Sequence, residues 1–280
     1  MLEQTLIRVA EVDSVKTEDF EMRYVHFGNR LGDPVVILPG LSIKSVMESY
    51  QAIARQYTIF ADNSDVYLFD RREDVPQGYD MDTMAEDTIK AMDVLGIRNG
   101  YLLGVSQGGM LAQLIAVKRP DLVKKMVLCS TAANVQPEEE NRIKEWMILA
   151  QQGRREELAM AFARLVYSPE IVEANSQLFT DMAESFTEDE LARFVIMAGA
   201  TAGFDIREKL KEISCPTLVI AGDSDRIFSV KKAEELAELV KGDLYIYEKG
   251  SHAVYDEKGD FPERIFIYFK HGLWEDMYLN

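Results

Sequence analysis

Gly104-Val105-Ser106-Gln107-Gly108 is the most informative pentapeptide of this chain. It places a serine between two glycines, where an apolar run over residues 101–105 gives way to an amphipathic run over residues 110–117. The first run has the pattern of a buried strand, and the second repeats apolar residues at helical spacing. Small residues let backbones approach closely at a strand-to-helix corner, where one residue is strained. The pattern therefore predicts a sharp corner that projects the Ser106 side chain away from a sheet.

This pentapeptide is weak evidence when it is taken alone. Roughly 0.1 matches are expected by chance in a chain of this length, because glycine and serine are common residues. A glycine-rich loop before a helix is the plain structural alternative. The strand before the motif and the helix after it favour a nucleophilic serine, and partner residues elsewhere would separate the two interpretations.

Only three histidines are available as such a partner. His26 lies in an alternating strand pattern and is expected to be half-exposed, and His271 is expected on the surface at the end of a final helix. His252 lies in the Gly/Ser loop 249–253, just after the apolar run 244–247. There it is free to point into a cleft, although a solvated loop histidine is the alternative.

A carboxylate is the third candidate, and it follows another apolar run. Residues 216–221 have the pattern of a strand buried on both faces and lead into Gly222-Asp223-Ser224-Asp225. Either aspartate could be a turn residue, since turns favour aspartate for local reasons. The chain order Ser106, Asp225, His252 favours Asp225 as the partner of His252.

Taken together, these motifs resemble the α/β-hydrolase superfamily over nearly the whole chain, including its order of serine, acid and histidine. The other residues that carry the resemblance are Asp70 after the run 66–69, Ala85-Glu86-Asp87, Leu95-Gly96-Ile97, Arg119-Pro120-Asp121-Leu122-Val123, Gly222-x-x-Asp225 and His252-x4-Glu257. The sequence departs from the family pattern twice. Leu38-Pro39-Gly40-Leu41 stands in place of a His-Gly pair, and Arg71-Arg72-Glu73-Asp74-Val75-Pro76 replaces a Gly-x-Gly-x-Ser segment.

The resemblance implies an α/β-hydrolase fold, with a mostly parallel central sheet, helices on both faces and an inserted helical cap. Apolar patterning over residues 5–12 and 20–27 predicts an opening antiparallel hairpin. From residue 35 onward strands alternate with helices, as expected for a parallel sheet with helices on both faces. The strands are predicted at residues 35–38, 66–69, 101–105, 126–129, 217–221 and 244–247. The expected core comprises residues 1–133 and 204–280, and the expected cap comprises residues 134–203.

Helical patterning fills the cap region. Helices are predicted over residues 138–152, 154–167, 171–183 and 188–200, the last beginning with the acidic turn Thr187-Glu188-Asp189-Glu190. The cap is rich in methionine and phenylalanine, some of which should face the cleft. These residues are Met147, Met160, Phe162, Phe179, Met182, Phe186, Phe194 and Met197.

Composition limits the other classes of function. The 280 residues carry a net charge of −17, which disfavours nucleic-acid partners and fits a small neutral or weakly charged substrate. No apolar stretch reaches membrane-spanning length, and the first ten residues lack a signal pattern, so export is not expected. Cys129 and Cys215 are expected to be buried free thiols, which fits a cytoplasmic location. No cofactor and no metal site are expected.

The predicted chemistry is that of a serine esterase that acts on a small, largely apolar carboxylic ester. Ser106 is the expected nucleophile, His252 the base and Asp225 its orienting partner, while the backbone N–H groups of Leu41 and Gln107 would hold the oxyanion. A thioesterase or a carbon–carbon bond hydrolase would use the same three side chains. A non-catalytic ligand-binding hydrolase fold is the alternative from another class.

Overall fold

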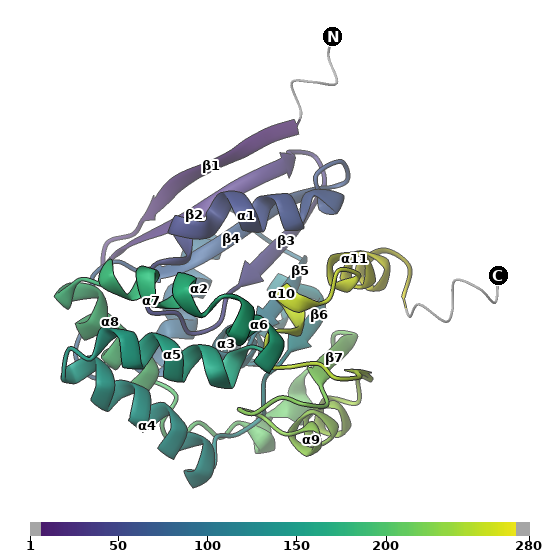
Figure 1. Cartoon of the computed structure of the whole chain (residues 1–280). Helices are drawn as coiled ribbons and strands as arrows, with labels where there is room; N and C mark the ends of the chain where they lie inside the picture. Colours follow the sequence, from purple (N-terminus) through teal and green to yellow (C-terminus); the bar gives the residue numbers. More distant parts are fainter. Residues whose placement is uncertain (1–6, 273–280) are drawn as a thin grey trace.

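The computed structural model describes residues 7–272 and contains one eight-stranded sheet in the order β1-β2-β4-β3-β5-β6-β7-β8 (Figure 1). β1 and β2, and likewise β2 and β4, pair antiparallel, and every later pair is parallel. The predicted opening hairpin and parallel sheet are therefore both confirmed, although residues 5 and 6 of the hairpin lie outside the described residues. The strands are β1 (Ile7–Lys16), β2 (Glu21–Asn29), β3 (Asp33–Leu38), β4 (Ser64–Arg72), β5 (Gly100–Val105), β6 (Val123–Cys129), β7 (Thr217–Gly222) and β8 (Asp243–Tyr247).

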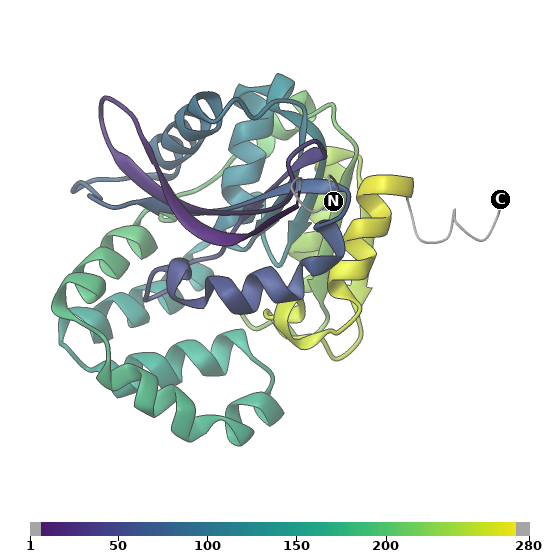
Figure 2. The ribbon, with the colours of Figure 1, turned by 90° about the horizontal axis from the view of Figure 1, so that it is seen from above.

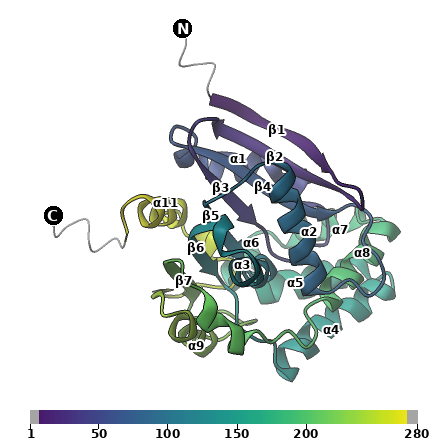
Figure 3. The ribbon, with the colours of Figure 1, turned by 180° about the vertical axis from the view of Figure 1, so that it is seen from behind.

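The sheet separates two hydrophobic cores, because successive side chains of a strand point to opposite faces. In β3, Val36 and Leu38 join one core while Val35 and Ile37 join the other. Figure 2 shows α2 and α3 on one side of the sheet and α1 and α11 on the other, and Figure 3 shows α2 and α3 from behind. The helices of the core are α1 (Tyr50–Gln56), α2 (Met81–Val94), α3 (Gln107–Lys118), α9 (Val230–Val240), α10 (Val254–Glu257) and α11 (Phe261–His271).

Five helices are inserted between β6 and β7, in the region where the sequence predicts a cap (Figure 1). They are α4 (Pro137–Gln151), α5 (Arg155–Val166), α6 (Pro169–Ala174), α7 (Ser176–Glu184) and α8 (Glu188–Gly199). α8 begins as predicted: Thr187 and Glu190 form a reciprocal capping box, in which each side chain satisfies the other residue's backbone N–H.

The single helix predicted over residues 171–183 is wrong, because the chain breaks there into α6 and α7. Asn175 leaves the helical conformation at φ −119° and ψ 17°. Its side-chain amide donates to the carbonyl oxygen of Ile171 at 2.8 Å. Asparagine ends helices in this way because its side chain competes for the hydrogen bonds of the backbone.

Two antiparallel segments, residues 133–135 and 204–206, join the inserted helices to the sheet. Asn134 forms an isolated β-bridge with Asp205. On either side of this bridge, the Val135 N–H donates to the Phe204 carbonyl oxygen at 2.8 Å, and the Ile206 N–H donates to the Ala133 carbonyl oxygen at 3.0 Å. The insertion therefore enters and leaves the core at one paired neck.

Candidate active site

Ser106 occupies the corner between β5 and α3, and its backbone is strained as predicted. Its φ of 51° and ψ of −118° lie in a region that side-chain-bearing residues rarely adopt. The strain persists because the neighbouring strand holds the corner: the Ser106 N–H donates to the Cys129 carbonyl oxygen at 2.8 Å, and the Thr131 hydroxyl donates to the Ser106 carbonyl oxygen at 2.8 Å. Such outliers concentrate at functional sites.

The flanking glycines allow the close backbone approaches at this corner. A Cβ atom on Gly104 would lie 2.5 Å from the carbonyl oxygen of Gly108. A Cβ atom on Gly108 would lie 2.0 Å from the carbonyl oxygen of Leu38 and 2.5 Å from that of Pro39. The two glycines of the pentapeptide are therefore required by packing, one within the corner and one against the end of β3.

His252 and Asp225 meet at the ends of neighbouring strands β7 and β8. His252 Nδ1 and Asp225 Oδ2 are 2.8 Å apart, and the two side chains are 3% and 1% exposed. The other Asp225 oxygen accepts from the backbone N–H groups of Ile227 at 2.7 Å and Phe228 at 3.0 Å. The carboxylate is thus fixed in orientation and engages one ring nitrogen of the histidine, while Asp223 is exposed on the surface.

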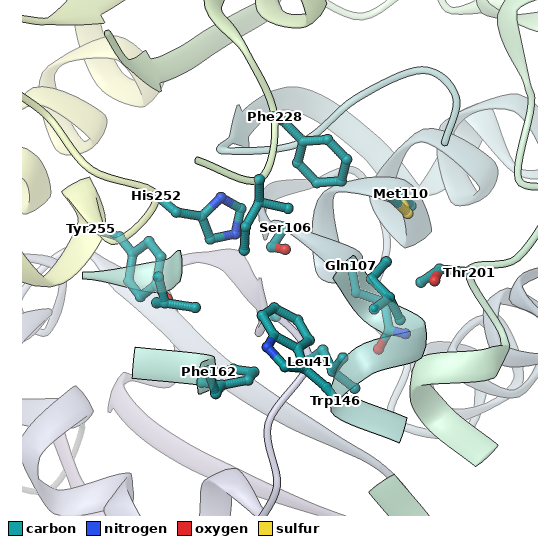
Figure 4. Close-up of a pocket in the computed structure, with 14 residues that line it drawn as sticks. Leu41, Ser106, Gln107, Met110, Trp146, Phe162, Thr201, Phe228, His252 and Tyr255 are labelled. Carbon is teal, nitrogen blue, oxygen red and sulfur yellow. The ribbon is translucent and has the colours of Figure 1, made fainter. Parts of the chain in front are cut away.

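One pocket collects the remaining predicted site residues. Ser106, His252, Leu41 and Gln107 all line it, and Figure 4 shows the hydroxyl of Ser106 and the ring of His252 facing the same space. The pocket is narrow, with a cavity volume of about 40 Å³. Its other lining residues are mostly apolar, and several come from the inserted helices. They are Gly40, Met110, Ile143, Trp146, Phe162, Val166, Thr201, Ile227, Phe228 and Tyr255.

Gln107 and Leu41, which both line this pocket, have backbone N–H groups without an acceptor in the described part of the protein. Gln107 is the first residue of α3, where an N–H has no acceptor within its own helix. Within residues 7–272, neither the Gln107 N–H nor the Leu41 N–H donates to another protein group. The partial positive charge at a helix N-terminus adds to their attraction for a negatively charged oxygen.

Two polar side-chain atoms in the pocket wall are buried without a hydrogen-bond partner among the described residues. They are the indole nitrogen of Trp146 and the amide oxygen of Gln107. The amide nitrogen of Gln107 is engaged, because it donates to the Met197 carbonyl oxygen of α8 at 2.7 Å. Burying an unpaired polar atom costs about 1–3 kcal/mol, so a ligand group that paired with either atom would recover part of this cost.

The sequence did not single out Trp146 or Tyr255 as pocket residues. Of the methionines and phenylalanines expected there, Phe162 lines the pocket, whereas Phe194 is buried in the hydrophobic core and Met182 is exposed. Trp146 lies on the same helical face as other apolar residues of α4, so its spacing alone does not distinguish a core side chain from a pocket side chain. Burial raises the pKa of Tyr255 above the usual range of a tyrosine.

The other histidines and the cysteines lie away from this pocket. His271 is exposed at the end of α11, as predicted. His26 in β2 pairs with Asp65, and its side chain is 12% exposed, so it is more buried than the half-exposed position expected for it. Cys129 is a buried free thiol whose pKa is raised by burial. Cys215 is also free but only half-buried, which corrects the expectation that both thiols are buried.

Two kinds of feature, a cluster of metal-binding side chains and a membrane-crossing helix, are absent from the described part of the chain. Residues 7–272 contain no group of three histidine, cysteine, aspartate or glutamate side chains placed to hold a metal ion. None of the helices in this range combines the length and the apolar character needed to cross a membrane.

Comparison with known proteins agrees with this architecture. The family model described as alpha/beta hydrolase fold matches residues 33–259. The chain is 25% identical over 245 residues to 3-oxoadipate enol-lactonase 2 of Acinetobacter baylyi, covering 84% of this chain and 88% of the relative. It is 28% identical over 262 residues to the AB hydrolase superfamily protein YisY of Bacillus subtilis, covering 87% and 94%.

Solved structures share the same fold. The alpha/beta hydrolase MGS-M2 from a deep-sea metagenome library superposes with a TM-score of 0.83 at 21% identity, covering 92% of this chain and 97% of that one. The sheet order, the strained corner after β5 and the family match together confirm the resemblance seen in the sequence. The chain belongs to the alpha/beta hydrolase fold family.

Proposed function

We propose that this chain is a serine hydrolase that cleaves a small, largely apolar carboxylic ester through an acyl-enzyme. The observation that carries the proposal is the 2.8 Å contact between His252 and Asp225 at the rim of a pocket that also contains Ser106. A strained serine, a histidine and an orienting carboxylate are the parts that nucleophilic acyl transfer requires. The available N–H groups of Leu41 and Gln107 supply the fourth part.

Acylation begins when the Ser106 Oγ attacks the ester carbonyl carbon and its proton passes to Nε2 of His252. Asp225 accepts a hydrogen bond from Nδ1–H, which fixes the tautomer and stabilises the imidazolium that forms. The carbonyl oxygen becomes an oxyanion and is held by the N–H groups of Leu41 and Gln107. As the C–O bond to the alcohol breaks, His252 returns the proton to the leaving alkoxide.

Deacylation repeats these steps with water as the nucleophile. His252 takes one proton from the water, and the resulting hydroxide attacks the acyl carbon through a second oxyanion. When the bond to Ser106 breaks, the same proton returns to Oγ. The products are a carboxylic acid and an alcohol, and the enzyme is restored.

The dimensions and lining of the pocket support a small substrate. A cavity of about 40 Å³ is well below the roughly 300–1,000 Å³ of sites that enclose drug-sized ligands. The walls are mainly apolar, and the unpaired Trp146 N–H offers a single donor to an oxygen of the substrate. The relation to an enol-lactonase points in the same direction, since a lactone is a cyclic ester.

We also propose that residues 134–203 form a cap that covers the pocket. The paired neck at Asn134 and Asp205 supports these boundaries. Two hydrogen bonds support the covering role, because they tie the cap to the site itself. The Gln107 side chain donates to Met197 in α8, and the Ala253 N–H, next to His252, donates to the Val166 carbonyl oxygen of α5 at 2.9 Å.

A panel of p-nitrophenyl esters of increasing acyl length tests the proposed function. The expected result is turnover that is highest for short acyl chains and falls as the chain outgrows the pocket. Ser106→Ala is expected to lower kcat by about 10⁶-fold. If no ester is hydrolysed, or if Ser106→Ala retains more than roughly one per cent of the wild-type rate, the assignment is wrong.

A further inference from the structure

In the loop that carries Leu41, Gly40 by itself does not determine the orientation of the peptide group between Gly40 and Leu41. Residues 39–45 connect β3 to the short helix that follows, and Gly40 lies directly over the serine, where a Cβ atom would be 3.2 Å from Ser106 Cβ. A glycine accepts backbone angles of either sign, so the peptide between Gly40 and Leu41 can present either its N–H or its carbonyl to the pocket. Something outside the glycine must therefore fix this peptide if Leu41 is to act as a donor.

Two adjacent residues at the end of β4 hold this loop at both ends. The Arg71 guanidinium donates through Nη2 to the Pro39 carbonyl oxygen at 2.7 Å. Asp70 accepts through Oδ2 from the hydroxyl of Ser45. The backbone N–H of Arg71 donates in turn to Asp70 Oδ1 at 2.7 Å, which links the two anchors.

Stability alone does not account for an arginine at position 71. The residue is 3% exposed, and besides Pro39 its guanidinium reaches the sulfur of Met84, 3.2 Å from Nε. Replacing a buried ionic group with an apolar side chain of similar volume is often neutral or stabilising. Burial also lowers the pKa of Arg71 to about 10, which reflects the cost of keeping its charge in the interior.

The inserted helices contact the same pair of residues. Arg193 of α8 donates to Asp70 Oδ1 at 3.3 Å, and this ion pair joins the cap to the end of β4. The loop 39–45, the end of β4 and α8 therefore meet at one polar cluster beside the pocket.

We propose that Arg71, supported by Asp70, is a positioning residue that fixes the loop 39–45 so that the Leu41 N–H points into the pocket. This inference rests on the proposed function, because it assigns Leu41 as an oxyanion donor. The charged segment 71–76, which replaces the family's glycine-rich stretch, then has a role: through Arg71 it sets the donor geometry from the neighbouring strand. Arg193 connects this geometry to the position of the cap.

The test compares Arg71→Met with Arg72→Met as a matched control. Arg72 is the next residue and its side chain is also engaged, donating to Asp74, Asp87 and Asp19 and not to the loop 39–45. Arg71→Met is expected to lower kcat on a short p-nitrophenyl ester by about 10²-fold, the lower end of the loss for one oxyanion donor, with KM changed less than about threefold. Arg72→Met is expected to stay within about threefold of wild type in both constants.

Relaxation of the backbone ¹⁵N nuclei gives a readout that does not depend on turnover. The order parameters of Gly40 and Leu41 are expected to fall in Arg71→Met and to be unchanged in Arg72→Met. If Arg71→Met does not fold, Arg71→Lys serves instead, and its single ammonium group is expected to give a smaller change in the same direction.

Unchanged order parameters in the loop 39–45, or a kcat in Arg71→Met equal to that of Arg72→Met, would overturn the inference. Failure of the proposed function gives a different result, since the wild type would then hydrolyse no ester. In that case the order parameters of the loop still decide whether Arg71 fixes it.

Discussion

Replacing Gly108 with alanine is expected to separate α3 from the loop that carries Leu41. The new Cβ atom would start 2.0 Å from the Leu38 carbonyl oxygen and 2.5 Å from that of Pro39, and both partners are backbone atoms that cannot rotate away. Reaching the 3.0 Å that real Cβ contacts respect requires a displacement of about 1 Å. Overpacking of this kind typically costs about 1–3 kcal/mol of stability.

The expected effect on activity is larger than the effect on stability. A misplacement of about 1 Å at a reacting centre can lower the rate by about 10²-fold, and the full loss of one oxyanion donor lowers it by about 10²–10³-fold. The assay is kcat on a short p-nitrophenyl ester, normalised to folded protein by thermal unfolding. Gly259→Ala is the matched control, because a Cβ atom added there would meet no other described residue within 4 Å beyond its chain neighbours. A Gly108→Ala variant that folds and keeps kcat within about threefold of the control would refute the reasoning.

Three further predictions concern the pocket and the core. Asp225→Asn is expected to lower kcat by about 10⁴-fold while the protein stays folded, because the histidine loses the partner that fixes its tautomer; a loss under tenfold, measured by steady-state kinetics, would contradict this role. Trp146→Phe keeps most of the apolar surface and removes the indole N–H. We expect the preference for an ester with an added acyl oxygen over its all-carbon analogue, measured as the ratio of their kcat/KM values, to fall by about 5–10-fold. An unchanged ratio would show that the indole touches no substrate oxygen. Cys129 is buried, and burial raises the pKa of its thiol. A thiol reagent at about pH 7 to 9 should therefore modify at most Cys215 in the native protein and both cysteines after unfolding. Rapid reaction of Cys129 in the folded protein would contradict the packing of β6.

Local sequence patterns were sufficient to predict the elements that present the site. The corner at Ser106 could be predicted because flanking glycines indicate close backbone packing. The loops that hold Asp225 and His252 could be predicted because each follows an apolar run that ends in turn residues. These signals are contained in a few neighbouring residues. The same locality explains why the central parallel strands were predicted, since a strand buried on both faces is an uninterrupted apolar run.

Features that depend on distant residues could not be predicted in the same way. Arg71 lies in a stretch of mixed charges that resembles a surface loop, and only the pairing of β3 with β4 brings its side chain to the Pro39 carbonyl oxygen. Trp146 has the spacing of any apolar residue in α4, so its place in the pocket wall depends on how the inserted helices pack. The break at Asn175 was missed because a single asparagine is tolerated in many helices, and whether its side chain ends one depends on local geometry.

Labelling with a fluorophosphonate probe tests most directly whether Ser106 is the nucleophile. Intact-mass analysis and peptide mapping are expected to show one phosphonate per chain, bound to Ser106 Oγ. The label should be absent in Ser106→Ala, and its rate of attachment should fall sharply in His252→Ala, which keeps the serine and removes its base. A wild-type chain that takes up no probe, or a Ser106→Ala chain that takes up as much as the wild type, would contradict the central claim.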